Sequence, residues 1–127
     1  IAGCIAFGAA IDYINSIGLD KINNYENHLL QYATAKLNSI ENVKIYGESE
    51  NKTSVISFNV KGIHPYDIGS ILDKMGIAVR TGQHCAQPIM DFFKITGTLR
   101  ISFAFYNTEE EIDFLIDTLR KAIKILS

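Results

Sequence analysis

The segment from Arg80 to Pro88 concentrates the side chains best suited to covalent chemistry. Gly82 and Pro88 bracket Cys85, so we expect its thiol to lie on a loop. Arg80 and His84 are nearby cations or potential cations, which lower a thiol pKa and raise the thiolate fraction that a nucleophile needs. The pattern indicates a nucleophilic Cys85. The alternative is a small packed residue, because free cysteines are often buried.

Arg100 is the second candidate, within an alternating segment predicted as a strand over residues 98–105. It lies on the face opposite the apolar residues of that strand. A planar guanidinium suits a carboxylate, whereas an exposed arginine on a solvated sheet face is the simpler alternative. Arg80 ends a neighbouring predicted strand, so we expect the two cations to flank one cleft.

The remaining cysteine and histidines are expected to be structural. Cys4 lies in an alanine-rich helical stretch and is predicted to pack in a core, and His28 is predicted to lie on a helix surface. His64 precedes a proline and is expected to cap or hydrogen-bond that turn. A catalytic pair of His84 with Cys85 is disfavoured, because adjacent side chains on an extended segment point apart. No ligand spacing among the cysteines and histidines indicates a metal site.

Helical periodicity predicts four longer helices and one helical turn. They cover residues 1–16, 21–38, 65–75 and 108–126, with the turn at residues 89–94. The helix ends carry known signals, namely Gly18 and Gly76 as stops, Asp20 as an N-cap, Pro65 in a first turn, and capping-box spacing of Thr108 with Glu111. The first helix is apolar around so much of its surface that something must cover it.

Four shorter segments are predicted as strands, at residues 43–46, 54–60, 77–80 and 98–105. The first two are separated by a polar loop and suggest a hairpin. Strands and helices in this order indicate an α/β (α+β) two-layer sandwich, with helices packed on a small, mostly antiparallel or mixed sheet.

Size and composition indicate one globular domain over residues 1–127, since 47% hydrophobic and 20% charged residues exclude disorder. A formal net charge of −2 makes nucleic acids and anionic membranes poor partners.

Two distant cysteines favour a reducing, cytoplasmic setting. The uncharged stretch of residues 1–11 is too short for a membrane span and lacks signal-peptide features. Because the sequence starts with Ile1, we expect it to derive from a longer chain.

Two motifs resemble one known family. The run RTGQHCAQP at residues 80–88 resembles the active-cysteine loop of the group II cysteine desulfurases, the SufS branch of the class V aminotransferases. The run RISFAFYNTEEE at residues 100–111 is similar to the strand and helix start that follow it. Segments 1–3 and 8–13 resemble the helix that leads into the family's small domain. The resemblance therefore spans essentially the whole chain.

This resemblance implies a C-terminal small domain of a longer pyridoxal-phosphate enzyme of fold type I, with residues 1–18 as the linking helix from a large domain. The family binds pyridoxal 5'-phosphate through a Schiff-base lysine in that large domain. No lysine here has the matching context, so no cofactor is expected on this chain alone. The full-length parent is expected to be a homodimer that converts L-cysteine to L-alanine.

The resemblance also implies roles for single residues. Cys85 matches the nucleophile that takes sulfur from the substrate as a persulfide, for iron–sulfur cluster assembly. Arg100 matches the arginine that pairs with the substrate carboxylate, and Arg80 matches a second active-site arginine. His84 matches the histidine before the cysteine, whereas Gln83 departs from the histidine of many members.

Two further expectations follow from the resemblance. Gly82 belongs to the supporting loop, and Tyr66 stands where relatives that serve a zinc-bearing SufU-type scaffold have a histidine, so a SufE-type acceptor is expected. Three alternatives stay open: selenocysteine lyase activity, an isolated non-catalytic interaction domain, and a stand-alone persulfide carrier.

Overall fold

The computed structural model describes residues 1–127 and contains five helices and four strands. The helices are α1 (Ala2–Ile17), α2 (Leu19–Asn38), α3 (Pro65–Lys74), α4 (Gln87–Phe93) and α5 (Glu109–Leu126). The strands are β1 (Val43–Tyr46), β2 (Val55–Val60), β3 (Arg80–Gly82) and β4 (Thr98–Ser102). The predicted α/β class and the helical turn near residue 90 are confirmed.

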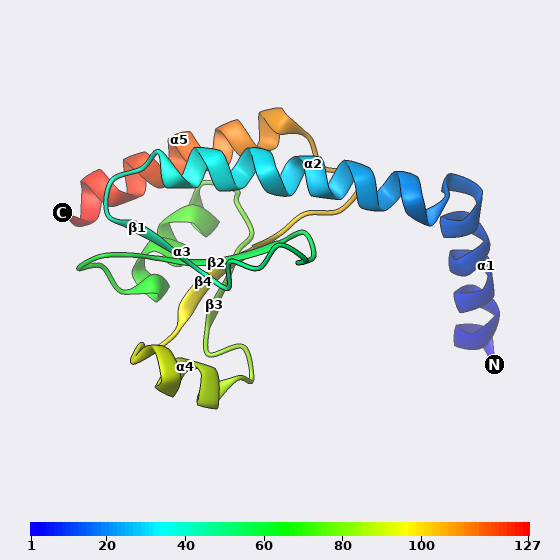
Figure 1. Ribbon diagram of the computed structural model, residues 1–127, viewed down its shortest axis with the longest axis horizontal. Helices are drawn as coiled ribbons and strands as arrows, with labels where there is room; N and C mark the ends of the chain where they lie inside the picture. Colours follow the sequence, from blue (N-terminus) through cyan, green and yellow to red (C-terminus); the bar gives the residue numbers. More distant parts are fainter.

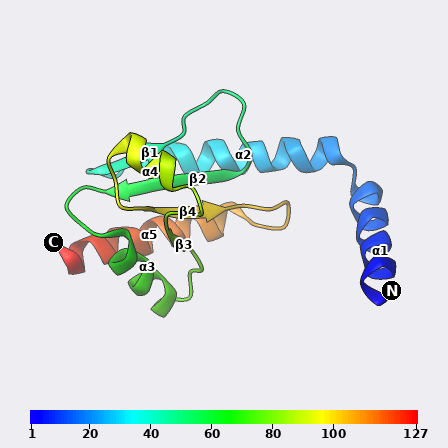
Figure 2. The same ribbon diagram turned by 90° about the horizontal axis from the view of Figure 1, so that it is seen from below.

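The four strands form one sheet in the order β1-β2-β4-β3, and every pairing is antiparallel. Strands β2 and β4 form its centre, and the alternating burial of β2 shows that only one face is sealed. On that sealed face, helices α2, α3 and α5 cover the sheet, while α4 lies on the opposite side (Figure 1). Seen from below, α4 lies in front of the strands (Figure 2).

The hydrophobic core lies between the sealed face of the sheet and these three helices. Its fully buried members include Leu29 of α2, Ile56 and Phe58 of β2, Leu99 of β4 and Leu119 of α5. Burial of such side chains contributes about 1.5–3 kcal/mol each, and this term holds the two layers together. The predicted two-layer arrangement is therefore confirmed, with the sheet antiparallel throughout.

Most of the predicted helix ends are confirmed. The Thr108 hydroxyl accepts from the Glu111 N–H while the Glu111 carboxylate accepts from the Thr108 N–H, which completes the capping box. His64 caps α3, because its Nδ1 accepts from the Tyr66 N–H at 3.3 Å. Asp20 is not the N-cap of α2, since that helix begins directly after Gly18, whose φ of 96° bends the chain without a loop.

Two predicted strands are displaced or shortened. The strand expected at residues 77–80 begins at Arg80 instead, because the Ile77 N–H donates to the Leu72 carbonyl and ties that segment to the end of α3. The strand expected to reach residue 105 ends at Ser102. There the chain turns, with the Asn107 side chain accepting from the Ala104 N–H at 2.9 Å.

Helix α1 extends away from the rest of the molecule and buries none of its residues (Figure 1). Its apolar side chains, including Ile5 and Phe7, are 71% and 68% exposed. No other part of residues 1–127 therefore covers the apolar surface of α1. The prediction that Cys4 packs in a core is wrong for this chain, because Cys4 is exposed. No single helix is long and apolar enough to cross a membrane, and α1 with α2 passes that test only as a pair bent by 76°.

Candidate functional site

Two arginines meet on the face of the sheet that α2, α3 and α5 leave uncovered. Arg80 of β3 and Arg100 of β4 are direct partners in the antiparallel register, and Ser57 of β2 pairs with Arg100 on its other side. Directly opposed residues project to the same face, so the two arginine side chains start from neighbouring positions on this face of the sheet. Arg80 is exposed, whereas Arg100 is half-buried.

Neither arginine has an acidic partner. The ion pairs of the structure join His28 to Glu109 and Lys36 to Asp113, both away from this face. Like charges placed opposite each other on neighbouring strands destabilise a sheet, so an unpaired arginine couple is a ready site for an anion. The Nε of Arg100 is moreover buried without a hydrogen-bond partner.

A cavity of about 300 Å³ lies beside Arg100, between the sheet and α4. Its polar lining comes from Tyr46, Ser57, His84, Thr98 and Arg100, and its apolar lining comes from α4 and the residues on either side of that helix. This volume is at the lower end of the range for small-molecule sites, and an apolar wall with a few polar groups is typical of them. Arg80 does not line this cavity, so the expectation that both arginines flank one cleft is not confirmed.

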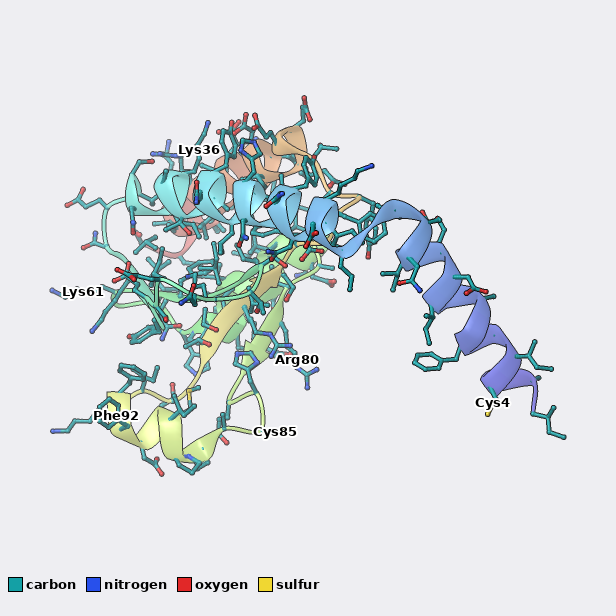
Figure 3. All side chains as sticks on the ribbon, turned by 45° about the vertical axis from the view of Figure 1, so that its right-hand side comes forward. Cys4, Lys36, Lys61, Arg80, Cys85 and Phe92 are labelled. Atoms are coloured by element: carbon teal, nitrogen blue, oxygen red, sulfur yellow. The ribbon has the colours of Figure 1, made fainter.

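Cys85 lies on the loop between β3 and α4, and its side chain is exposed. Figure 3 shows Cys85 and Arg80 on the same side of the molecule, below the sheet. The loop is tightly bent, because Gly82, His84 and Cys85 have φ angles of 112°, 56° and 57°. The segment is therefore not extended. The expectation that His84 and Cys85 point apart assumed an extended segment, so it does not apply here.

Two successive non-glycine residues in the left-handed region require support from elsewhere. Each costs about 1–2 kcal/mol relative to an ordinary conformation, although histidine tolerates this region better than most residues. Part of the support comes from within the loop, where the Ala86 N–H donates to the Gln83 carbonyl. More comes from His84, whose Nε2 lies 3.0 Å from the Thr98 hydroxyl and 3.2 Å from the Thr98 carbonyl oxygen.

His84 does not contribute the positive charge expected of it. Its partial burial, followed by the nearby positive charge of Arg100, lowers its pKa from the ordinary value of 6.5. The ring is therefore neutral at pH 7. Of the two cations expected near Cys85 within its own segment, only Arg80 remains, and His84 serves as a hydrogen-bonded link between the loop and β4.

The base of the loop is fixed by a close backbone crossing. Gly97 lies so near Gly82 that a Cβ at position 97 would be 2.9 Å from the Gly82 carbonyl carbon and oxygen. The Asn59 side-chain N–H donates to the Gly97 carbonyl at 2.8 Å and anchors this crossing to β2. The sequence did not identify Asn59 and Thr98 as residues that support the cysteine loop. The available signal was the strand alternation, which places Thr98 on the same face as Arg100.

The remaining candidates lie outside the cavity. Gln83 is exposed on the loop, and Tyr66, at 65% exposure, lies near the start of α3. His28 is on the surface as predicted, and its Nε2 lies 2.6 Å from a Glu109 carboxylate oxygen, which links α2 to α5. No three histidine, cysteine or acidic side chains group together as a metal site.

Two relatives that are similar in sequence to this chain are both named cysteine desulfurases. The chain is 50% identical over 126 residues to a cysteine desulfurase of Wigglesworthia glossinidia brevipalpis, and 46% identical over 125 residues to one of Serratia proteamaculans. These alignments cover 99% and 98% of the chain, but the chain spans about 30% of the length of each relative.

Solved structures agree in fold. A cysteine desulfurase from Thermococcus onnurineus NA1, in its apo form, superposes with a TM-score of 0.87 at 41% identity, over 93% of this chain and 30% of its own. The Escherichia coli cysteine desulfurase CsdA, in an S-sulfonic acid form, superposes with a TM-score of 0.93 at 31% identity, over 99% of this chain and 31% of its own.

The family model for class V aminotransferases matches residues 1–115. The matched range includes the bent cysteine loop and both arginines. The chain therefore belongs to the class V aminotransferase family.

Proposed function

We propose that this chain is the C-terminal small domain of a cysteine desulfurase of the group II, SufS-type branch. In this proposal, residues 1–127 form one domain, and residues 1–18 link it to a large domain. The observation that carries the proposal is an exposed Cys85 on a strained loop beside two arginines without acidic partners. Sulfur transfer needs an accessible thiol, and an amino-acid substrate needs a cationic partner for its carboxylate.

The proposed roles follow from this geometry. Cys85 receives the sulfur of L-cysteine and holds it as a persulfide, while alanine is the other product. Arg100 pairs with the substrate carboxylate, because its guanidinium lines the cavity and has an unused buried donor. Arg80 lies opposite it and adds positive charge near the loop. Gly82 and His84 support the loop, and Gln83 stays at its exposed surface.

The family and the cysteine desulfurase relatives imply pyridoxal 5'-phosphate in the full-length enzyme. The residues of this chain do not fit that group by themselves. No lysine lines the cavity beside Arg100, while Lys61 and Lys94 line a separate hollow near His64. A Schiff base needs a lysine at the reacting carbon, so we place the cofactor site in the remainder of the longer protein.

We also propose a SufE-type thiol protein as the sulfur acceptor, in the reducing cytoplasm and for iron–sulfur cluster assembly. Tyr66 is exposed where SufU-type partners meet a histidine, and a protonated phenol is a poor zinc ligand at neutral pH. His64 is a weak substitute, because its Nδ1 accepts from the Tyr66 N–H, which leaves the proton of the neutral ring on Nε2, whereas a zinc ligand needs an unprotonated nitrogen. Sulfide release measured with each acceptor class tests this proposal. Strong activation by a zinc scaffold, lost in His64→Ala, would contradict it.

The main experiment uses the full-length parent, which we expect to be a homodimer. Cys85→Ala should abolish sulfur release from L-cysteine and leave the cofactor absorbance unchanged. Arg100→Ala should raise the KM for cysteine, at a cost of about 2–5 kcal/mol if the carboxylate pair is buried. Sulfur release by Cys85→Ala, or a wild-type KM for cysteine in Arg100→Ala, would refute the assigned roles. Parallel assays with L-selenocysteine distinguish a selenocysteine lyase.

A further inference from the structure

The tautomer of His84 is determined by its partners. A carbonyl oxygen only accepts hydrogen bonds, so the Nε2 that lies 3.2 Å from the Thr98 carbonyl oxygen must carry the proton. The Thr98 hydroxyl, at 3.0 Å from the same nitrogen, then acts as a second acceptor. The other ring nitrogen, Nδ1, is left as a bare acceptor, and it is buried without a partner.

This arrangement does not suit a base that works by protonation. Adding a proton to Nδ1 would create a buried donor with no acceptor, on a ring already close to Arg100. The lowered pKa of His84 agrees with this geometry. His84 is therefore better placed to hold the loop than to take a proton from Cys85.

Thr98 is the fixed end of this contact. It is 1% exposed on the central strand β4, and its register partner is Gly82, at the start of the bent loop. The His84 ring thus reaches from the left-handed part of the loop back to the strand that also carries Arg100. One residue separates Thr98 from Arg100, so the same strand holds the loop and the proposed carboxylate partner.

We propose that Thr98 is a positioning residue, which holds the His84–Cys85 bend through the His84 imidazole and so sets the direction of the Cys85 thiol relative to Arg100. The consequence for sulfur transfer rests on the proposed function. The hydrogen-bonded link itself does not, and it is measurable in the resting protein.

The decisive variant is Thr98→Val, which removes the shorter contact, to the hydroxyl, and keeps both the backbone carbonyl acceptor and the shape of the side chain. Thr98→Ser restores the hydroxyl. Thr118→Val is the matched control, because Thr118 is also fully buried, lies on α5 and has a hydroxyl without a hydrogen-bond partner. All variants are made in the full-length protein.

Three measurements test the proposal. In wild type, ¹⁵N spectra of histidine-labelled protein should show the Nε2-protonated tautomer of His84. In Thr98→Val, peptide-resolved hydrogen exchange should accelerate over residues 82–86 and stay unchanged in the core. The kcat for cysteine should fall about three- to tenfold at constant KM, as expected for one neutral hydrogen bond. Thr98→Ser should recover both properties, and Thr118→Val should alter neither.

The results separate the two proposals. If the protein is inactive as a desulfurase, the tautomer and the local exchange still decide whether Thr98 anchors the loop. An Nδ1-protonated ring, unchanged exchange at residues 82–86 in Thr98→Val, or an equal kcat loss in Thr118→Val would each overturn the inference. Accelerated exchange throughout Thr98→Val would also overturn it, since that pattern shows general destabilisation.

Discussion

Gly97→Ala directly perturbs the backbone crossing beneath the cysteine loop. Gly97 is buried, and its added Cβ would lie 2.9 Å from the carbonyl carbon and oxygen of Gly82 and 3.0 Å from its Cα. Ordinary contacts begin at 3.4 Å, so the two backbones must separate by about half an ångström. The neighbouring atoms are backbone atoms and cannot rotate away. The φ of Gly97 lies outside the glycine-favouring range, so the penalty is steric and not conformational.

The size of the effect follows from overpacking. Inserting a methyl group into a closely packed site costs about 1–3 kcal/mol. For a domain of 127 residues, 1 kcal/mol lowers the Tm by about 4 °C, so we expect a decrease of about 4–12 °C. Because Gly82 precedes His84 and Cys85, the same shift should also increase the mobility of the loop.

Thermal unfolding of this chain, followed by circular dichroism, measures the change. Gly3→Ala is the matched control, since its Cβ would meet nothing within 4 Å on α1. Replacing a helical glycine with alanine is favourable by up to about 1 kcal/mol, so the control should not lower the Tm. If Gly97→Ala has the same Tm as the wild type, the crossing is not close-packed and the argument for a rigid loop base fails.

Three further predictions concern stability and cofactor binding. Thr108→Ala should lower the free energy of unfolding by about 1 kcal/mol, measured in urea, because the Glu111 N–H loses its cap. The hydrogen bonds from Lys36 and Tyr32 lower the pKa of Asp113 from its ordinary 3.8, so this carboxylate stabilises the fold above that pH. Its contribution is lost as the pH falls through the lowered pKa, and acid titration of Asp113→Asn should show a smaller loss than wild type. The chain alone should give no stoichiometric, borohydride-trappable adduct with pyridoxal phosphate at a single lysine, and mass spectrometry of the reduced mixture checks this.

Features with local physical causes were predictable from the sequence. Helix α5 starts at its capping box, and α3 starts at a proline preceded by a capping histidine, because both signals satisfy orphan N–H groups within one turn. The alternation of β4 placed Arg100 on the open face, because successive side chains of a strand point to opposite faces of the sheet. Cys85 on a loop followed from the glycine and proline around it.

Features that depend on distant contacts were not predictable. The left-handed bend at His84 and Cys85 has no glycine at either position to predict it. The residue that supports the bend, Thr98, lies on β4, distant in the sequence. Likewise, Ile77 and Val79 have strand-like composition but are partly buried against the core before β3 begins. Contacts made only in the folded state decided both cases.

The strand order has a consequence for how the domain is synthesised. The central pairing joins β2, near the middle of the chain, to β4, near its end, so β2 has only β1 as a partner until β4 has left the ribosome. A two-stranded hairpin is marginal in water, and Ile56 and Phe58 stay uncovered during that interval. The apolar faces of α2 and α3 must likewise wait for α5, which packs against both. We therefore expect this domain to fold in one late step, and chains interrupted before residue 98 to require chaperones or be degraded.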